Sequence, residues 1–344
     1  MAGVLNHPAD RSRRPRPRDF RHRLTSELLG PAGALALRRS LPAPAARTGA
    51  GVPVAAGVPH ATPAPVGPGA LSVTWLGHAS ALLRVGGITA LVDPVLGRGI
   101  LGAGARLTPP GLTVEALPPV DVLLISHDHY DHLDAPTVRR LPRDVRVLVG
   151  VGGGPWFTHR GFTDVTELDW WESVRVGNTG GPGGPGARIE FVPAHHWSRR
   201  GAFDVARRLW GGWVLTAPDG RSVYHAGDTG DGPFPGRIGA RHRPEIALLP
   251  VGAYRPRPLL RGVHLDPEEA VAAMDALRAR VMVPIHWGTF VLSGEPVTEP
   301  IEHTRAAWAR SRRPRADLWD LAVGETRTAS PPPPDPRAGA ARPT

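Results

Sequence analysis

The segment Leu123-Leu124-Ile125-Ser126 leads without a break into His127-Asp128-His129-Tyr130-Asp131-His132. Its first part is a short apolar run of the kind that forms a buried strand. The six residues that follow place four potential metal ligands on one loop, because imidazole and carboxylate groups bind divalent cations such as zinc. Two cations about 4 Å apart need such crowding, since each takes four or five ligands. The segment therefore predicts a two-metal hydrolytic site at the end of a strand.

Three further clusters of His or Asp each come directly after an apolar run that indicates a strand. They are His195-His196 after Ile189–Val192, Asp228 after Val223–Ala226, and His286 after Val281–Ile285. Taken singly, such a residue is more often an ordinary hydrogen-bonding side chain than a ligand. Ligands from distant parts of a chain can nevertheless converge on one edge of a sheet sandwich. The agreement in order and position therefore supports one shared metal site.

The composition limits the kind of protein that carries this site. The chain has 344 residues, 41% of them hydrophobic, which is enough for one large domain with a sizeable core. Its 42 Gly and 40 Pro residues are typical of short strands joined by turns. No cysteine occurs, so metal ligands must be His and carboxylate side chains. No apolar run is long enough to cross a membrane, and we expect a cytoplasmic protein.

The formal net charge of +10 does not predict a nucleic-acid-binding face, because of where the charge lies. Residues 1–50 hold ten Arg against three acidic residues, a net +7, which leaves +3 for the other 294 residues. The basic character therefore belongs mostly to an Arg- and Pro-rich lead-in. A nuclease would need a basic channel within the folded part, and we expect no nucleic-acid partner.

The chain divides into three parts. Residues 1–69 are expected to form a largely disordered lead-in or arm, residues 70–328 the folded domain, and residues 329–344 a disordered Pro-rich tail. Within the lead-in, Phe20, Leu24 and Leu28 recur at helical spacing beside several Arg. This pattern fits a short amphipathic helix in peripheral contact with an anionic membrane. A helix that packs on the domain, or a fluctuating arm, is the alternative that we favour.

Short apolar runs punctuated by Gly and Pro predict the strands of the folded part. These runs are Leu71–Leu76, Ala81–Val85, Ile88–Val92, Val122–Ile125, Val145–Val149, Ile189–Val192, Val214–Thr216, Val223–Ala226, Ile246–Val251 and Val281–Ile285. A helix is expected to begin at Asp266, because Pro267 and Glu269 complete a capping box, and a shorter one after Asp134. Many strands with a few interleaved helices predict an α/β (α+β) fold of two packed sheets flanked by helices.

The order His-x-His-x-Asp-His, His, Gly-Asp, His resembles that of the metallo-β-lactamase superfamily, which implies a four-layer αββα sandwich. The residues around these motifs are similar to those of one branch, the N-acylphosphatidylethanolamine-hydrolysing phospholipase D family and its bacterial relatives. The similar segments are Thr74–Ala79, Val92–Pro94, Ile125–Asp134, Pro193–Arg199, Ala226–Gly230, Leu249–Tyr254, His264–Val271 and Pro284–Phe290. They span about residues 70–300, which is nearly the whole folded part.

The resemblance implies a role for each ligand. It assigns one metal to His127, His129 and His196, the other to Asp131, His132 and His286, and a bridging position to Asp228. A water or hydroxide would lie between the ions. Zinc is the usual occupant, although iron or manganese suits the same donors. His196 is preferred to His195 because the branch has its ligand directly before the Trp, so His195 would line the site.

Four other residues are candidates with less sharply defined roles. Asp128 would orient the nucleophile, and a hydrogen-bonding or solvent-facing role fits it equally well. His264 resembles a branch histidine near the metals, which makes it a candidate for proton transfer or substrate contact. A residue ahead of a helix with no chemical role is the alternative. His78 and Asp93 would orient the imidazoles of the ligands.

The implied chemistry favours a phosphodiesterase acting on a phospholipid such as N-acylphosphatidylethanolamine, or on a similar phosphodiester. Two divalent cations lower the pKa of bound water and polarise a phosphoryl or carbonyl oxygen, so a lactonase or other carbonyl-ester hydrolase is the alternative. The branch disfavours a β-lactam hydrolase. A non-catalytic scaffold would have lost ligands, and none is missing. Asp231 and Arg255 depart from the branch; we expect them near the pocket mouth, where they leave the specificity open.

Overall fold

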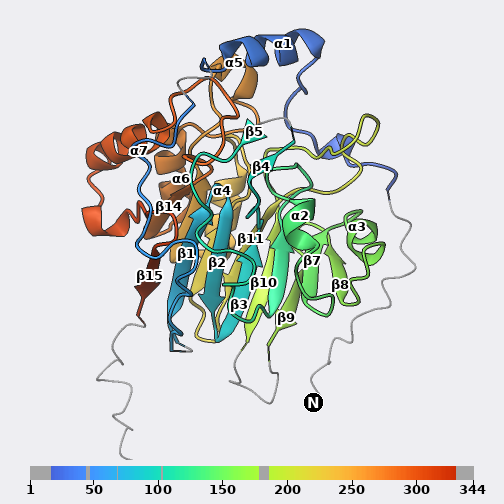
Figure 1. Ribbon diagram of the computed structural model, residues 1–344, viewed down its shortest axis with the longest axis vertical. Coiled ribbons are helices and arrows are strands. Elements are labelled where there is room, and N and C mark those ends of the chain that lie inside the picture. Colours follow the sequence, from blue (N-terminus) through green and yellow to red (C-terminus); the bar gives the residue numbers. More distant parts are fainter. Residues whose placement is uncertain (1–16, 44–46, 68, 102–103, 178–185, 331–344) are drawn as a thin grey trace, which may run out of the picture.

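Two β-sheets lie face to face at the centre of the protein, in a computed structural model that describes residues 17–43, 47–67, 69–101, 104–177 and 186–330 (Figure 1). Within these ranges the first sheet has seven strands, in the order β15-β1-β2-β3-β6-β7-β8. Their bounds are Leu71–Gly77 (β1), Ser80–Val85 (β2), Ile88–Val92 (β3), Val122–Ile125 (β6), Arg146–Gly150 (β7), Val165–Leu168 (β8) and Thr326–Ala329 (β15). The predicted Pro-rich tail lies outside the described residues from position 331 onward.

The second sheet has six strands among the described residues, in the order β14-β13-β12-β11-β10-β9. Their bounds are Ser173–Val176 (β9), Ala187–Val192 (β10), Gly212–Thr216 (β11), Ser222–His225 (β12), Ile246–Pro250 (β13) and Val281–Ile285 (β14). A small hairpin of β4 (Gly99–Ile100) and β5 (Gly104–Ala105) stands apart from both sheets. Each of the ten strands that the sequence predicts is confirmed, with ends shifted by a residue or two.

Helices cover the outer faces of the two sheets (Figure 1). Helices α2 (Ala135–Val138) and α3 (Gly154–Thr158) contribute the side chains Val138 and Phe157. These pack with Leu123 and Ile125 of β6. Buried side chains of the second sheet form one core with those of three helices. These are α4 (Phe234–His242), α6 (Pro267–Leu277) and α7 (Glu299–Arg310). Neighbouring β6 side chains alternate, since Leu124 faces that central core instead. The four layers form the αββα sandwich that the sequence predicts.

Strand direction decides where the chemistry-bearing residues meet. In the first sheet β3, β6, β7 and β8 run parallel, and in the second β12, β13 and β14 do. Parallel strands end at the same edge of a sheet. The residues that follow β3, β6, β12 and β14 therefore lie together: Asp93, His127, Asp228 and His286.

Helix α6 begins as its sequence predicts. The side chain of Asp266 accepts a hydrogen bond from the amide of Glu269, whose carboxylate accepts one from the amide of Asp266. Helix α2 likewise starts after Asp134, which accepts from the amide of Thr137. Strands β8, β9 and β15 escaped prediction because they are partly exposed and short.

The helix expected from Phe20 to Leu28 is not formed. That stretch holds only a 3-10 turn at Arg21–Arg23, and the helix α1 begins at Pro31 and ends at Ser40. Proline is well suited to the first turn of a helix, where no amide partner is lost. Phe20 is buried in the central core with Leu24 packed beside it, so the segment packs on the domain but without the helix that was expected there. None of the helices in the described ranges is long and apolar enough to cross a bilayer.

Candidate metal centre

Three imidazoles converge at one end of the sandwich. The Nε2 atom of His127 lies 2.9 Å from Nδ1 of His129, and Nε2 of His196 lies 3.2 Å from that same atom. His127 and His129 come from the loop after β6, and His196 from the loop after β10. Ring nitrogens that face one another so closely have the arrangement of ligands around a shared cation.

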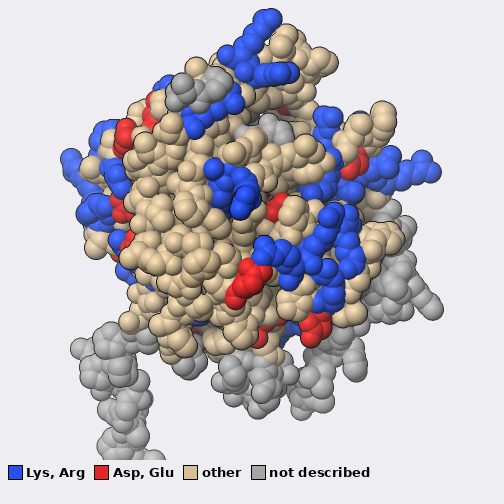
Figure 2. Space-filling model, viewed as in Figure 1, with Lys and Arg blue, Asp and Glu red and all other residues tan. Residues whose placement is uncertain are grey.

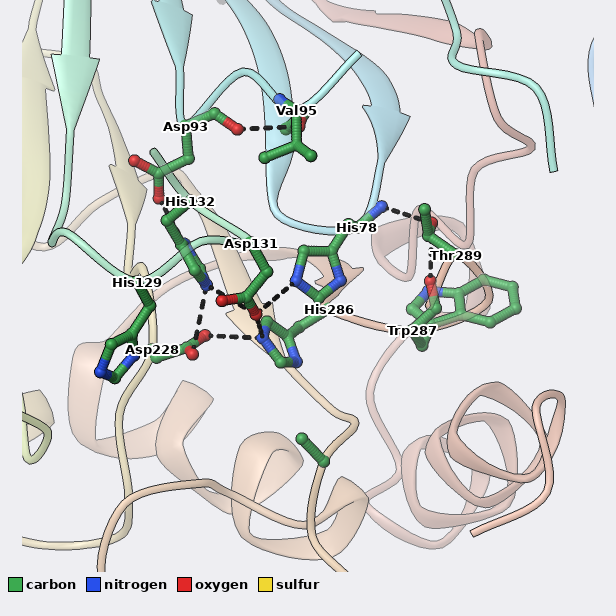
Figure 3. Close-up of polar contacts among 12 residues, drawn as sticks. His78, Asp93, Val95, His129, Asp131, His132, Asp228, His286, Trp287 and Thr289 are labelled. Atoms are coloured by element: carbon green, nitrogen blue, oxygen red, sulfur yellow. Dashed lines mark hydrogen bonds and ion pairs between the residues drawn. The ribbon is translucent and has the colours of Figure 1, made fainter. Parts of the chain in front are cut away.

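A second cluster lies beside the first. Asp131, His132 and His286 bring donor atoms within 4.8 Å of one another, together with His78 (Figure 3). The Oδ2 atom of Asp131 is 3.4 Å from Nε2 of His286 and 3.6 Å from Nε2 of His132. The sequence places these residues on β6 and β14 loops more than 150 positions apart, and the fold brings them together.

Asp228 stands between the two clusters. Its Oδ2 atom is 3.2 Å from Nε2 of His132 and 3.7 Å from Nε2 of His196. Its Oδ1 atom is 3.2 Å from Nε2 of His286. One carboxylate therefore reaches ligands of both clusters, which is the position that the sequence predicts for it.

The donor set fits a metal ion. Burial lowers the pKa of His129 to about 4 and of His196 to about 3, so both rings are neutral near pH 7 with a lone pair available. Burial alone would raise the pKa of Asp228, but His132 and His286 hold it well below its usual range. In the described part of the chain His132 Nε2, His286 Nε2 and Asp228 Oδ1 are buried without a hydrogen-bond partner. A cation would satisfy all three.

Asp93 and Ser126 hold the ligand loop from behind. The carboxylate of Asp93 accepts from the amide of Ser126 at 2.7 Å and from its hydroxyl at 2.5 Å. The same carboxylate is 2.8 Å from Nδ1 of His132, and the Ser126 hydroxyl is 3.0 Å from Nδ1 of His127. These bonds leave the Nε2 atoms of both rings facing the centre. Asp93 is therefore placed where the sequence predicts, whereas Ser126 was overlooked although it directly precedes His127.

His78 supports the second cluster in the same way. Its Nε2 atom is 3.0 Å from Oδ2 of Asp131, and its carbonyl accepts from the amide of His286. The hydroxyl of Thr289 accepts from the amide of His78 at 2.7 Å. A ring in this place can orient Asp131 or serve as a ligand itself.

Three of these residues have left-handed backbones. The φ angles of His78, Asp93 and His286 are 54°, 42° and 65°. For residues other than glycine this conformation costs about 1 kcal/mol or more each, and it is concentrated at functional sites. Each residue follows the last position of a strand, so the strained turn aims its side chain into the centre.

The family comparison agrees with this geometry. Residues 89–287 match the family described as beta-lactamase superfamily domain. The chain belongs to the metallo-β-lactamase superfamily. It is 38% identical over 238 residues to N-acyl-phosphatidylethanolamine-hydrolyzing phospholipase D 1 of Caenorhabditis elegans, and the match covers 64% of each chain. It is 31% identical over 223 residues to a UPF0173 metal-dependent hydrolase of Methanopyrus kandleri, covering 64% of this chain and 85% of the relative.

A solved structure shows the same superfamily fold. The metallo hydrolase Igni18 of Ignicoccus hospitalis superposes with a TM-score of 0.55 and 24% sequence identity, over 76% of this chain and 99% of that one. The family model and the His/Asp centre agree in placing a candidate metal site in this superfamily member, and one relative is named a metal-dependent hydrolase.

The adjacent histidines of this metallo-β-lactamase member face different surroundings. His196 lies in the first cluster and its Nδ1 is 2.9 Å from the carbonyl oxygen of Val263. His195 packs its ring on Phe234 with centroids 4.4 Å apart, and burial lowers its pKa. The fold therefore directs His196, and not His195, to the metal ligands.

His264 and the two departures from the branch are placed differently. The Nδ1 atom of His264 is buried 3.9 Å from Asp228 Oδ2, and the ring forms part of the cavity wall above the ligands. Arg255 instead pairs with Glu299, and neither it nor Asp231 lines that cavity.

Asp128 is buried and held by an arginine that sequence reasoning missed. Its Oδ2 atom accepts from Nη1 of Arg208 at 2.6 Å, and its carbonyl accepts from Arg200 at 3.0 Å. Asp204 shares Arg208 at 2.8 Å. Burial raises the pKa of Asp128 against the opposing charge of Arg208. Asp128 thereby ties the ligand loop to the segment around residues 200–208, while its Oδ1 atom has no partner among the described residues.

Replacing Asp93 should loosen metal binding without altering any ligand. In Asp93→Ala the rings of His132 and His127 lose their anchor, so the affinity for zinc should fall by roughly 10- to 100-fold. Competition with a chromogenic chelator measures that affinity. Asp121→Ala is the matched control, because Asp121 bonds the amide of Thr89 at the opposite end of the same two strands. Equal affinity in both variants would contradict an orienting role for Asp93.

Asp128 can be tested as an anchor or as a catalytic group. If it acts through the ion pair, Arg208→Met should lower the free energy of unfolding by about 2 kcal/mol, a value reduced because Arg208 is a quarter exposed. Asp128→Asn should then also lower the free energy of unfolding. The double variant Asp128→Asn/Arg208→Met should lose less than the sum of the two single losses. Urea unfolding measures both. A fall in kcat of roughly a thousandfold in Asp128→Asn, at unchanged stability and metal content, would instead place Asp128 in the chemistry.

Proposed function

We propose that this protein is a phosphodiesterase that uses two divalent metal ions, zinc in the first instance, to cleave a phospholipid or a similar phosphodiester. Support for two ions comes from the two ligand clusters and from Asp228, whose oxygens approach members of both. Support for zinc comes from the all-nitrogen-and-oxygen donor set. When bound, such ions supply an activated water and stabilise charge on the phosphoryl oxygens.

The side chains that line the cavity above the ligands support this class of substrate. The cavity holds about 190 Å³ and is lined by both polar and apolar side chains. The polar ones are Glu27, His129, Asp131, His196, Asp228, His264 and His286. The apolar ones include Leu259, Leu260, Val263 and Leu292. A molecule with a charged ester group and a hydrocarbon portion matches this division.

The residues of the chain have separable tasks in this proposal. The buried, neutral rings of His127 and His196 hold their nitrogens toward the centre, and Asp228 fixes the spacing of the two clusters. His264 stands at the cavity wall with Nδ1 unpartnered, within reach of a substrate oxygen. The apolar walls exclude water from the reacting group, which strengthens every electrostatic contact there.

The relative from Caenorhabditis elegans supports the same substrate class, because it is named an N-acyl-phosphatidylethanolamine-hydrolyzing phospholipase D. The match covers 64% of that enzyme's length, so the activity of the whole relative is a proposal for this chain. N-acylphosphatidylethanolamine combines a phosphodiester with long acyl chains, and it is the first substrate to test.

The decisive assay uses the zinc-reconstituted protein with three classes of substrate. N-acylphosphatidylethanolamine in mixed micelles and bis(p-nitrophenyl) phosphate should both be hydrolysed, and a panel of lactones should not. The double variant His127→Ala/Asp228→Ala should lose at least about a thousandfold in kcat/KM, because both clusters lose a ligand. Chelation followed by addition of zinc should abolish and restore turnover of the wild-type protein. Turnover of lactones alone would establish the carbonyl-ester alternative, and full activity of the double variant would disprove metal catalysis at this site.

A further inference from the structure

The segment Phe20–Ser40 contributes Glu27 and three leucines to the lining of the metal cavity. Leu28 and Leu29 precede α1, Leu37 lies within it, and all three line the cavity together with the metal ligands. Opposite them stand Leu260 near the end of α5 (Arg257–Leu260) and Leu292. This segment lies outside residues 89–287, the part that matches the superfamily.

The segment is fixed to the domain at its beginning. The amide of Phe20 donates to the carbonyl of Ala206 at 2.6 Å, and the Phe20 side chain is buried in the central core. The guanidinium of Arg23 pairs with Asp169 and lies 4.8 Å from the ring centroid of Trp170. These contacts hold the chain beside the cavity before it reaches Leu28.

Two close approaches then guide the chain across the cavity. A Cβ atom at Gly262 would lie only 2.6 Å from Cβ of Ser26, so the absence of a side chain there lets the segment pass beside α5. At the end of α1, a Cβ atom at Gly294 would lie 2.9 Å from the carbonyl oxygen of Ser40. The segment therefore touches the rim both before and after it crosses the cavity.

Helix α1 itself is held only at the surface. None of its residues is buried, and Leu35 is 48% exposed. Figure 1 shows α1 as the outermost element at this end of the molecule, and Figure 2 shows Arg side chains around it. Leu28, which precedes α1, and Leu37, which lies within it, line the cavity instead, so this lining is the feature of the segment that calls for an explanation.

We infer that Leu28, Leu29 and Leu37 determine specificity: they form a roof that binds the hydrocarbon portion of a substrate and favours aliphatic over small polar esters. This inference deepens the proposed function and rests on it for the reaction, but not for the binding of an aliphatic chain. The metal ligands would hold the polar group, while the roof and the α5 side contact the chain from two sides.

The binding test uses 11-(dansylamino)undecanoic acid, whose fluorescence rises in an apolar site, with metal-free and with zinc-loaded protein. In the variant Leu28→Ser/Leu29→Ser/Leu37→Ser, the dissociation constant should rise by about tenfold or more in both forms, because three apolar contacts are lost. The matched control is Leu35→Ser, which alters α1 at a side chain outside the cavity and should change the constant by less than about twofold. Equal affinity in the two variants, high or low, would overturn the inference.

Folding is checked by the thermal midpoint of each variant. If the triple variant fails to fold, Leu37→Ser alone tests the roof, because α1 contains no buried residue and should tolerate it. A rise of about threefold in the dissociation constant is then expected, and no change would refute the roof.

Kinetics separate this inference from the proposed reaction. The triple variant should lose about tenfold or more in kcat/KM for N-acylphosphatidylethanolamine and keep that for bis(p-nitrophenyl) phosphate within about twofold. An equal loss on both substrates would contradict a role in specificity. If the wild-type protein hydrolyses neither phosphodiester while the variants still differ in probe binding, the proposed reaction fails and the roof stands.

Discussion

Two carboxylates lie among the same histidines, Asp228 buried and Asp131 partly buried, and the arrangement of the whole metal end follows from this constraint. A buried carboxylate is costly unless charge and hydrogen bonds compensate it. Burial opposes the charged form of His286, yet Asp228 and Asp131 raise its pKa to about 9, so without a metal this ring carries a proton. A divalent cation supplies positive charge in the same place. A bound cation would therefore take the place of a proton on this ring, so metal binding should release protons.

The fold meets this constraint by bringing strand ends together. Asp93 and His127 follow parallel strands of one sheet, and Asp228 and His286 follow parallel strands of the other. Their backbones come from a packed core with few degrees of freedom, so the ligands are positioned before any ion arrives. The left-handed conformations of Asp93 and His286 are part of the cost of that preorganisation. The hydrogen bonds of the Asp93 carboxylate with Ser126 and His132 offset some of it.

Most strands of the sandwich could be predicted from the sequence, because an apolar run is a local signal for a buried strand. The role of each ligand followed from the resemblance to the superfamily, because a single His or Asp after a strand is more often an ordinary hydrogen-bonding residue. Contacts between distant segments gave no such signal, and Arg208 was missed because nothing near it in the sequence points to Asp128. The prediction of a helix at Phe20–Leu28 was wrong. Its apolar residues are accommodated by the burial of Phe20 in the core, and Pro31 is a better helix start. For the pair His195 and His196 the resemblance favours His196, which directly precedes the Trp, and the packing of His195 on Phe234 agrees with that choice.

The boundary of the superfamily domain does not coincide with the boundary of the cavity. The ligands lie within residues 89–287, whereas part of the wall comes from Leu28, Leu29 and Leu37. Wall residues and metal ligands can then change independently, because a substitution in the wall leaves the ligands in place. The anchors at Phe20 and Arg23 lie away from the ligands, so the segment can change its apolar content without losing its attachment. Under the proposed function, the core would determine the reaction and the covering segment would select the substrate that reaches it.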